Sequence, residues 1–381
     1  MNISRREFAS ISFLIAAGGA ILPRVARAVE PDEVTFTSEI AVEVTNSFLE
    51  TDYPASAYYA GNPIPFFYQV GKIAGYVVSV YCNGETSGYV VLDTTSDVLI
   101  SEFAIGVGYN DLESSLLNGP SYSSESLLHS EGDCGSIIYR DGTNGYILFR
   151  EDDSGVSEFP SDPFVVHPTT FSDDPTRPWD EATYSINKIL GDFQINEWIT
   201  TTNAFYSIAQ STITSQANRY ACLVTAGYTC AQMLGILPHS TTYFFADEYL
   251  DIWNKTQTVQ SGSGSGYITG STSNRNYLSG MQSYCSEHGV SVSTDFKAFD
   301  GIPALGIGVD DFTSAVRRHS PCVLGSANHG VTVEGFIDAT NSYTSQNMQF
   351  LTVYDGWYTG ARQIYYNSSS LTNKVGLFLN A

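Results

Sequence analysis

Two cysteines lie eight residues apart in the segment QANRYACLVTAGYTCAQML, and their positions predict different chemistry. Residues 224–234 have a helical pattern that Gly235 and Pro238 stop, so Cys222 falls in the first turn of the predicted helix. The positive end of the helix dipole favours a thiolate there. Cys230 lies about 12 Å further along the helix, at 1.5 Å per residue, which favours a buried core thiol. Cys222 is therefore the candidate nucleophile.

Three other residues are candidates for an acyl-transfer site with Cys222. The side-chain amide of Gln216, six residues earlier, can donate a hydrogen bond to an oxyanion beside the backbone N–H of Cys222. His329 begins the strand-like run NHGVTVEGF, and Asp355 ends a second run, MQFLTVYDGW. A thiolate nucleophile needs an imidazole to exchange protons with the substrate, and the imidazole needs a carboxylate or amide to fix its tautomer. Asp338 competes with Asp355 for that role, and a structural role remains the alternative for each residue.

The order of these residues resembles that of papain-like cysteine peptidases, in particular streptopain-type enzymes and peptidases related to the bacteriocin-processing family. The resemblance covers residues 200–366. It implies an α+β catalytic domain, in which a helix bearing the cysteine packs on an antiparallel sheet bearing the histidine and aspartate. It also implies that peptide bonds of a protein or peptide substrate are hydrolysed through a thioester, without a cofactor or metal. In that scheme Cys222 is the nucleophile, His329 the base and acid, Asp355 the orienting residue and Gln216 the oxyanion donor.

The chain departs from this family pattern in two places. Many members have Gly-Pro or Gly-Ser after the cysteine, whereas Leu223 and Val224 stand here, where the substrate backbone would approach. The spacing from His329 to Asp355 is also longer than usual, and we interpret ATNSYTSQNM as a long hairpin loop that absorbs the difference. Two other functions therefore stay open. One is an acyltransferase or amidase that acts on cell-wall peptides, and the other is an inactive papain-fold protein that binds a surface partner.

The N-terminus has the features of a twin-arginine signal peptide. Arg5 and Arg6 are followed by an apolar run at residues 11–22 and by the small-x-small site ARA at residues 26–28. The apolar run is shorter than the ~20 residues that cross a bilayer, and no later segment is long and apolar enough to do so. We therefore expect residues 1–28 to be removed and the mature chain to be secreted or displayed at the cell surface, without a transmembrane segment.

The remaining chain divides into a β-rich half, a connection and a half that contains both helices and strands. Residues 29–165 alternate short apolar runs with the turn signals NGETSG and DGTNG, which favours an antiparallel sheet, with possible short helices at 112–117 and 123–129. This half resembles the propeptide of streptopain-type enzymes, which implies a zymogen; a permanently attached β-rich module is the alternative. Residues 166–200 are the predicted linker. A proline-rich and acidic stretch begins just before them and continues into them. The predicted peptidase domain spans 201–381, where QSGSGSG is interpreted as a flexible loop.

The composition limits the partners of the chain. Its 381 residues include 17 basic and 40 acidic side chains, for a net charge of −23, and removal of the signal peptide would make the charge more negative. Such a surface repels phosphate backbones and anionic lipids, which argues against binding to nucleic acid or to membrane surfaces. The six cysteines are too scattered for a disulfide scaffold and contain no CxxC pair that would predict zinc. The sequence makes no prediction of the oligomeric state.

Overall fold

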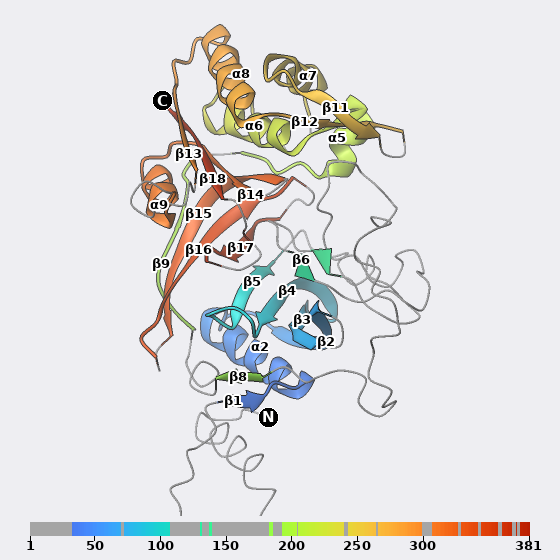
Figure 1. The fold of residues 1–381 in the computed structure, drawn as a ribbon, viewed down its shortest axis with the longest axis vertical. Helices are drawn as coiled ribbons and strands as arrows, with labels where there is room; N and C mark the ends of the chain where they lie inside the picture. Colours follow the sequence, from blue (N-terminus) through green and yellow to red (C-terminus); the bar gives the residue numbers. More distant parts are fainter. Residues whose placement is uncertain are drawn as a thin grey trace, which may run out of the picture.

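The computed structural model of the chain describes residues 33–69, 72–106, 130–131, 137–138, 183–185, 193–203, 205–239, 243–263, 266–298, 307–326, 329–341, 344–356, 360–367, 371 and 374–381. The predicted signal peptide, most of the predicted linker and the possible helices at 112–117 and 123–129 lie outside the described residues. The described part is a mixed α+β structure built around a large antiparallel sheet (Figure 1). The predicted α+β class is therefore confirmed.

The N-terminal half folds as an antiparallel meander with one helix packed against it. Its four strands pair in sequence order: β2 (Tyr58–Gln69), β3 (Lys72–Cys82), β4 (Glu85–Asp93) and β5 (Ile100–Ile105). Asn83 and Gly84, with φ of 53° and 86°, form the tight turn between β3 and β4, which confirms the hairpin predicted at NGETSG. Helix α2 (Ser38–Asp52) is capped by the side chain of Thr37, which accepts a hydrogen bond from the backbone N–H of Ile40.

The C-terminal half contributes five of the described helices: α5 (Gln210–Ala217), α6 (Cys222–Met233), α7 (Ala246–Lys255), α8 (Asn274–Glu287) and α9 (Val309–Arg317). Every residue of α6 is buried, which makes it the central helix of this half. Helices α7 and α8 pack around α6, whereas α9 lies apart from them against β14, β15, β16 and β18 of the sheet (Figure 1). Gly235, with a φ of 71°, follows α6, which confirms the predicted end of that helix.

Seven strands of the C-terminal half belong to the large sheet: β9 (Phe193–Thr200), β13 (Ser293–Ala298), β14 (Cys322–Ser326), β15 (His329–Asn341), β16 (Asn347–Tyr354), β17 (Arg362–Tyr365) and β18 (Val375–Asn380). Along one side of β15 lies β16, and along the other lie β14, beside its first residues, and β9, beside its last. Strand β9 comes from the end of the predicted linker.

The structure corrects two loop predictions. Strands β15 and β16 stay paired as far as Thr340 and Asn347, so the first three and last two residues of ATNSYTSQNM lie in strands rather than in a long loop. In the same way, the first part of QSGSGSG belongs to β11 (Val259–Ser263), which forms a hairpin with β12 (Ile268–Ser271). In both segments cross-strand hydrogen bonds outweigh the local preference of Gly, Ser and Asn for turns.

One continuous sheet joins the two halves of the chain. Its strand order is β13-β18-β14-β15-β16-β17-β5-β4-β3-β2, and β9 adds to β15. The two halves meet where β17 pairs with β5, with Gln363 opposite Phe103 and Ile364 opposite Glu102. Smaller sheets complete the described structure: β1 (Glu33–Thr35) with β8 (Thr183–Ser185), β6 (Ser130–Glu131) with β7 (Ile137–Ile138), and β10 (Arg219–Tyr220) with β12 and β11.

Of the three hydrophobic cores formed by the described residues, two contain side chains from both halves of the chain. Successive residues of β4 point to opposite faces, so Tyr89 and Val91 join the core around α6 while Val90 and Leu92 join the core beside α2. The third core lies beneath α9. The N-terminal sheet therefore packs into the same core as Cys222.

No helix in the described ranges is both long enough and apolar enough for a transmembrane span.

Candidate active site

Cys222 is the first residue of α6, as the sequence predicts. The residue before it, Ala221, is extended, with φ of −150° and ψ of 131°, and serves as the N-cap. The hydroxyl of Tyr249 accepts a hydrogen bond from the backbone N–H of Ala221 at 3.0 Å and lies 3.3 Å from Oγ1 of Thr225, which fixes the start of the helix. Cys222 is 6% exposed, so its thiol lies beneath the surface at the positive end of the helix dipole.

Cys230 has the environment of a core residue. Its side chain is fully buried, and burial raises the pKa of its thiol to about 12, even though the hydroxyl of Tyr277 donates a hydrogen bond to Sγ at 3.8 Å. Burial also raises the pKa of Cys285 to about 11 and that of Cys322 further still. These three cysteines are therefore protonated thiols at neutral pH and are poor nucleophiles.

Leu223 and Val224 belong to the hydrophobic core around α6. Leu223 is 7% exposed and Val224 is fully buried. A Cβ atom at Gly330 would lie only 2.4 Å from Cδ2 of Leu223, so the start of α6 rests directly on the start of β15. This contact brings together Leu223 and Gly330, the residues next to Cys222 and His329. Leu223 is the bulky residue at the position where many family members have glycine.

His329 begins β15 and is 3% exposed, opposite Ser326 of β14. The pKa of its imidazole is lowered to about 3, chiefly by burial and in addition by the positive charge of Arg362, whereas a hydrogen bond to the backbone of Asp355 acts in the opposite direction. The imidazole is therefore neutral at pH 7 in this form of the protein. The predicted start of a strand at His329 is confirmed.

Asp355 directly follows β16, and the residue after it packs against the first turn of α6. The next residue, Gly356, has a φ of 78°, and a Cβ there would lie 2.8 Å from Cγ2 of Thr225. The hydrogen bond between His329 and the backbone of Asp355 makes the two residues neighbours, one at the start of β15 and the other just after β16. Asp338 is nine positions beyond His329 on β15, about 30 Å away at ~3.3 Å per residue, so it cannot orient the imidazole.

The carboxylate of Asp355 is held by an arginine that the sequence analysis did not identify. Oδ2 of Asp355 lies 3.1 Å from Nε of Arg362, and both side chains are fully buried. Nη1 of Arg362 donates a hydrogen bond to Oε1 of Glu102, also at 3.1 Å, and the hydroxyl of Tyr89 donates to the same oxygen. Arg362 therefore lies between the candidate orienting residue and a glutamate of the N-terminal sheet.

The sequence contained a weak signal for this ion network. Glu102 interrupts the apolar strand ISEFAI, and Arg362 opens the strand RQIY, so each places a charge in a segment that otherwise reads as buried. A buried charge requires a partner of opposite sign. The partner lies 260 residues away, however, and its identity depends on the pairing of β5 with β17.

Gln216 lies in the last turn of α5 and is exposed. Asn218, in the left-handed conformation with φ of 53°, ends that helix, and β10 leads the chain back to Cys222. The role of Gln216 as an oxyanion donor remains a prediction.

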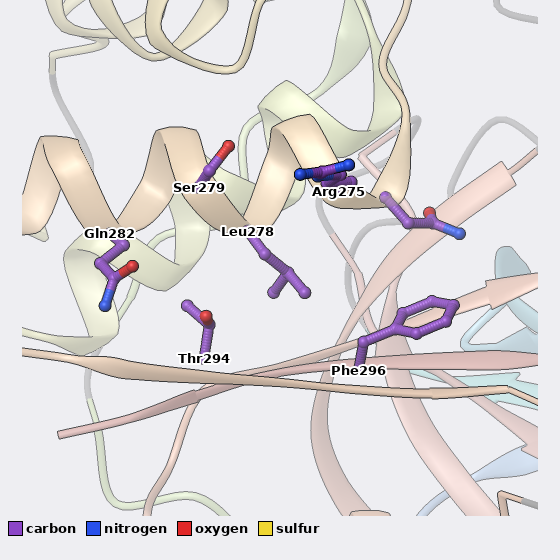
Figure 2. Close-up of a pocket in the computed structure, with 7 residues that line it drawn as sticks. Arg275, Leu278, Ser279, Gln282, Thr294 and Phe296 are labelled. Carbon is purple, nitrogen blue, oxygen red and sulfur yellow. The ribbon is translucent and has the colours of Figure 1, made fainter.

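A hollow of about 580 Å³ lies away from these residues, between α8 and β13. Figure 2 shows Leu278 of α8 and Phe296 of β13 facing it from opposite sides. Phe296 is 48% exposed, and Arg275 and Thr294 also line the hollow. None of the candidate catalytic residues contributes to its lining.

Comparison of the chain with models of known protein families and with curated proteins finds no match.

Proposed function

We propose that the protein is an exported cysteine peptidase of papain-like type that is made as an inactive precursor. The observation that carries this proposal is the contact between the start of α6 and the start of β15, where Leu223 packs on Gly330. That contact lies beside a cysteine at a helix N-terminus and a histidine at the start of a strand, and this histidine forms a hydrogen bond with the backbone of the aspartate that follows the next strand. A nucleophile, a base and an orienting group in this order are what acyl transfer by a thiol requires.

The chemistry assigned to these residues proceeds in two steps. The thiolate of Cys222 attacks the carbonyl carbon of the scissile peptide, and protonated His329 gives its proton to the leaving amine, which produces a thioester. Water then attacks the thioester while neutral His329 accepts its proton, which breaks the C–S bond, releases the carboxylic acid product and regenerates the thiolate of Cys222 beside protonated His329. The backbone N–H of Cys222 and the amide of Gln216 would stabilise the oxyanion in both steps.

The charge state of the site supports a precursor. A cysteine peptidase needs a histidine that can carry a proton near neutral pH, but the pKa of His329 is about 3. In addition, the carboxylate of Asp355 is already paired with Arg362. The N-terminal sheet contributes Val77, Tyr89, Val91 and Ala104 to the core that contains Cys222. Loss or displacement of that sheet is therefore the step that would create an active enzyme.

The same burial favours one alternative, an inactive papain-fold protein that binds a partner. Cys222 and His329 are only 6% and 3% exposed, as expected for residues that contact no substrate. The two functions differ in one measurable property. A peptidase gains a reactive Cys222 thiol when the chain is cut between its halves, whereas a binding protein keeps that thiol buried.

The proposal is tested by limited proteolysis of the full chain within the proline-rich acidic segment, residues 160–182, followed by assays with a fluorogenic peptide and with iodoacetamide. We expect the cut protein to cleave the peptide and to be alkylated at Cys222, as located by peptide mapping. Cys222→Ala should abolish cleavage. Gln216→Ala should lower kcat by about 10²–10³, the usual effect of one oxyanion donor.

Cys230→Ala is the matched control, because it removes a thiol from the same helix. It should reduce stability and leave the peptide cleavage of the folded protein in place, since Cys230 is buried with a pKa of about 12. Loss of activity in the Cys230 variant alone, with folding unchanged, would assign the nucleophile to the wrong cysteine.

A further inference from the structure

The N-terminal sheet supplies more to the candidate site than a cover. Glu102 of β5 and Arg362 of β17 form an ion pair of 3.1 Å between side chains that are 5% and 0% exposed. Two buried carboxylates thus face one guanidinium, because Asp355 pairs with its other side. Tyr89, also from the N-terminal sheet, donates a hydrogen bond to Glu102 and so fixes the position of that carboxylate.

We propose that Arg362 is an electrostatic switch of the candidate active site, which the N-terminal sheet holds in the inactive position by the pairing of β5 with β17. While β5 is paired with β17, the guanidinium stays on Asp355 and its charge acts on His329. The inference rests on the proposed function, because it takes His329 as the general base.

The geometry gives the direction of the effect. A positive charge beside an imidazole opposes its protonation, and a carboxylate that is already paired with arginine is less able to support an imidazolium. Without the N-terminal sheet, β17 would become an edge strand and Arg362 would be open to water. The guanidinium could then leave Asp355, whose carboxylate would become available to protonated His329. An imidazolium in turn favours the thiolate of Cys222.

Several charged or titratable groups lie on the elements around His329. Cys222 starts α6, Asp355 follows β16, Arg362 starts β17, and Glu102 faces Arg362 from β5. The positive charge of Arg362 lowers the pKa of the imidazole. Replacement of Arg362 should therefore change the protonation of His329 more than replacement of any other side chain in the network.

The test compares opposite ends of the ion pair in the full, uncut chain. Histidines labelled with ¹³C at Cε1 are titrated by NMR, and the His329→Gln variant assigns the resonance. In the wild-type protein we expect a neutral His329 ring throughout the pH range in which the protein is folded. Arg362→Gln should raise the pKa of His329 by about 1–3, because it removes the cation and releases Asp355. Glu102→Gln should leave it unchanged or lower, because the cation remains and loses one of its two counter-charges.

This difference in sign separates a switch from a structural contact. If the N-terminal sheet only kept water out, both replacements would loosen the interface and both would raise the pKa of His329. Equal increases in the two variants would therefore overturn the proposal, as would an unchanged pKa in folded Arg362→Gln. Glu85→Gln, at an exposed position of the same N-terminal sheet, is the control for the chemical change and should have no effect.

Two further variants keep the test decisive if Arg362→Gln does not fold. The double variant Glu102→Gln with Arg362→Gln removes both charges of the pair and should raise the pKa of His329. Arg362→Lys retains the charge and should leave the imidazole neutral; an increase equal to that of the double variant would show that charge is not the cause. Circular dichroism and thermal unfolding establish which variants are folded.

Peptide cleavage by the cut wild-type protein separates this inference from the proposed function. Cleavage after the cut, together with an unchanged His329 in the folded Arg362 variants, would refute the switch and leave the peptidase. A raised pKa in those variants, together with a cut protein that cleaves no peptide, would refute the peptidase and leave the electrostatic coupling.

Discussion

Replacement of His329 by glutamine tests the burial of the candidate base through the stability of the protein. Glutamine has a similar size and remains neutral, so the variant lacks only the titration. The pKa of His329 is about 3 in the folded protein, against an ordinary value of 6.5. Between these values the unfolded chain binds a proton that the native protein does not bind. Stability is therefore fully present above pH 6.5 and is lost as the pH falls toward 3.

The expected size of this loss follows from the two pKa values. When the unfolded chain binds one more proton than the native protein, the free energy of unfolding changes by about 1.4 kcal/mol per pH unit. Because the unfolded histidine titrates around 6.5, the free energy of unfolding lost between pH 7 and pH 5 is about 2 kcal/mol. The free energy of unfolding should fall by that amount in the wild-type protein relative to His329→Gln. Other groups, such as Glu334, titrate in both proteins and cancel in the difference.

The assay is urea unfolding of the wild-type protein and the variant at pH 7, 6 and 5. His239→Gln serves as the control for replacement of an exposed histidine. A difference between wild type and His329→Gln that stays constant from pH 7 to pH 5 would refute the reasoning, because it would mean that His329 is protonated as readily in the native protein as in the unfolded chain.

Three other predictions concern packing, a buried acid and export. Gly330→Ala should lower the free energy of unfolding in urea by about 1–3 kcal/mol, because its Cβ would overlap the side chain of Leu223. Burial raises the pKa of Glu334 to about 7, so wild-type stability falls as the pH rises from 4.5 to 7, and Glu334→Gln should be more stable above pH 7 by at most about 3 kcal/mol in thermal unfolding. Lysine at both Arg5 and Arg6 should retain the protein in the cytoplasm, as judged by immunoblots of cell fractions, and continued export would indicate the general secretory route.

Local signals in the sequence predicted much of the architecture around Cys222. Gly235 ends α6 as expected, and Asn83 with Gly84 forms the expected hairpin turn. His329 starts one strand and Asp355 follows the next, also as expected. Each of these features depends on backbone preferences and on an apolar pattern within a few residues, which the sequence displays directly.

Two segments show where local preference misleads. ATNSYTSQNM and QSGSGSG are rich in residues that favour turns, yet both contribute residues to strands. The backbone groups of β15 and β11 form hydrogen bonds with neighbouring strands. A prediction from the segment alone cannot include these bonds, because the partners lie elsewhere in the sequence.

The sequence by itself determined which residues have the types and order for thiol chemistry, because that information lies in short segments. The tertiary structure alone decided how those residues are charged. Glu102 and Arg362 are 260 residues apart and meet only because β5 pairs with β17, at the joint between the two halves of the sheet. The same pairing places the guanidinium of Arg362 on Asp355, where its positive charge lowers the pKa of His329. Burial and electrostatic fields depend on distances through the folded protein, so no local pattern encodes them.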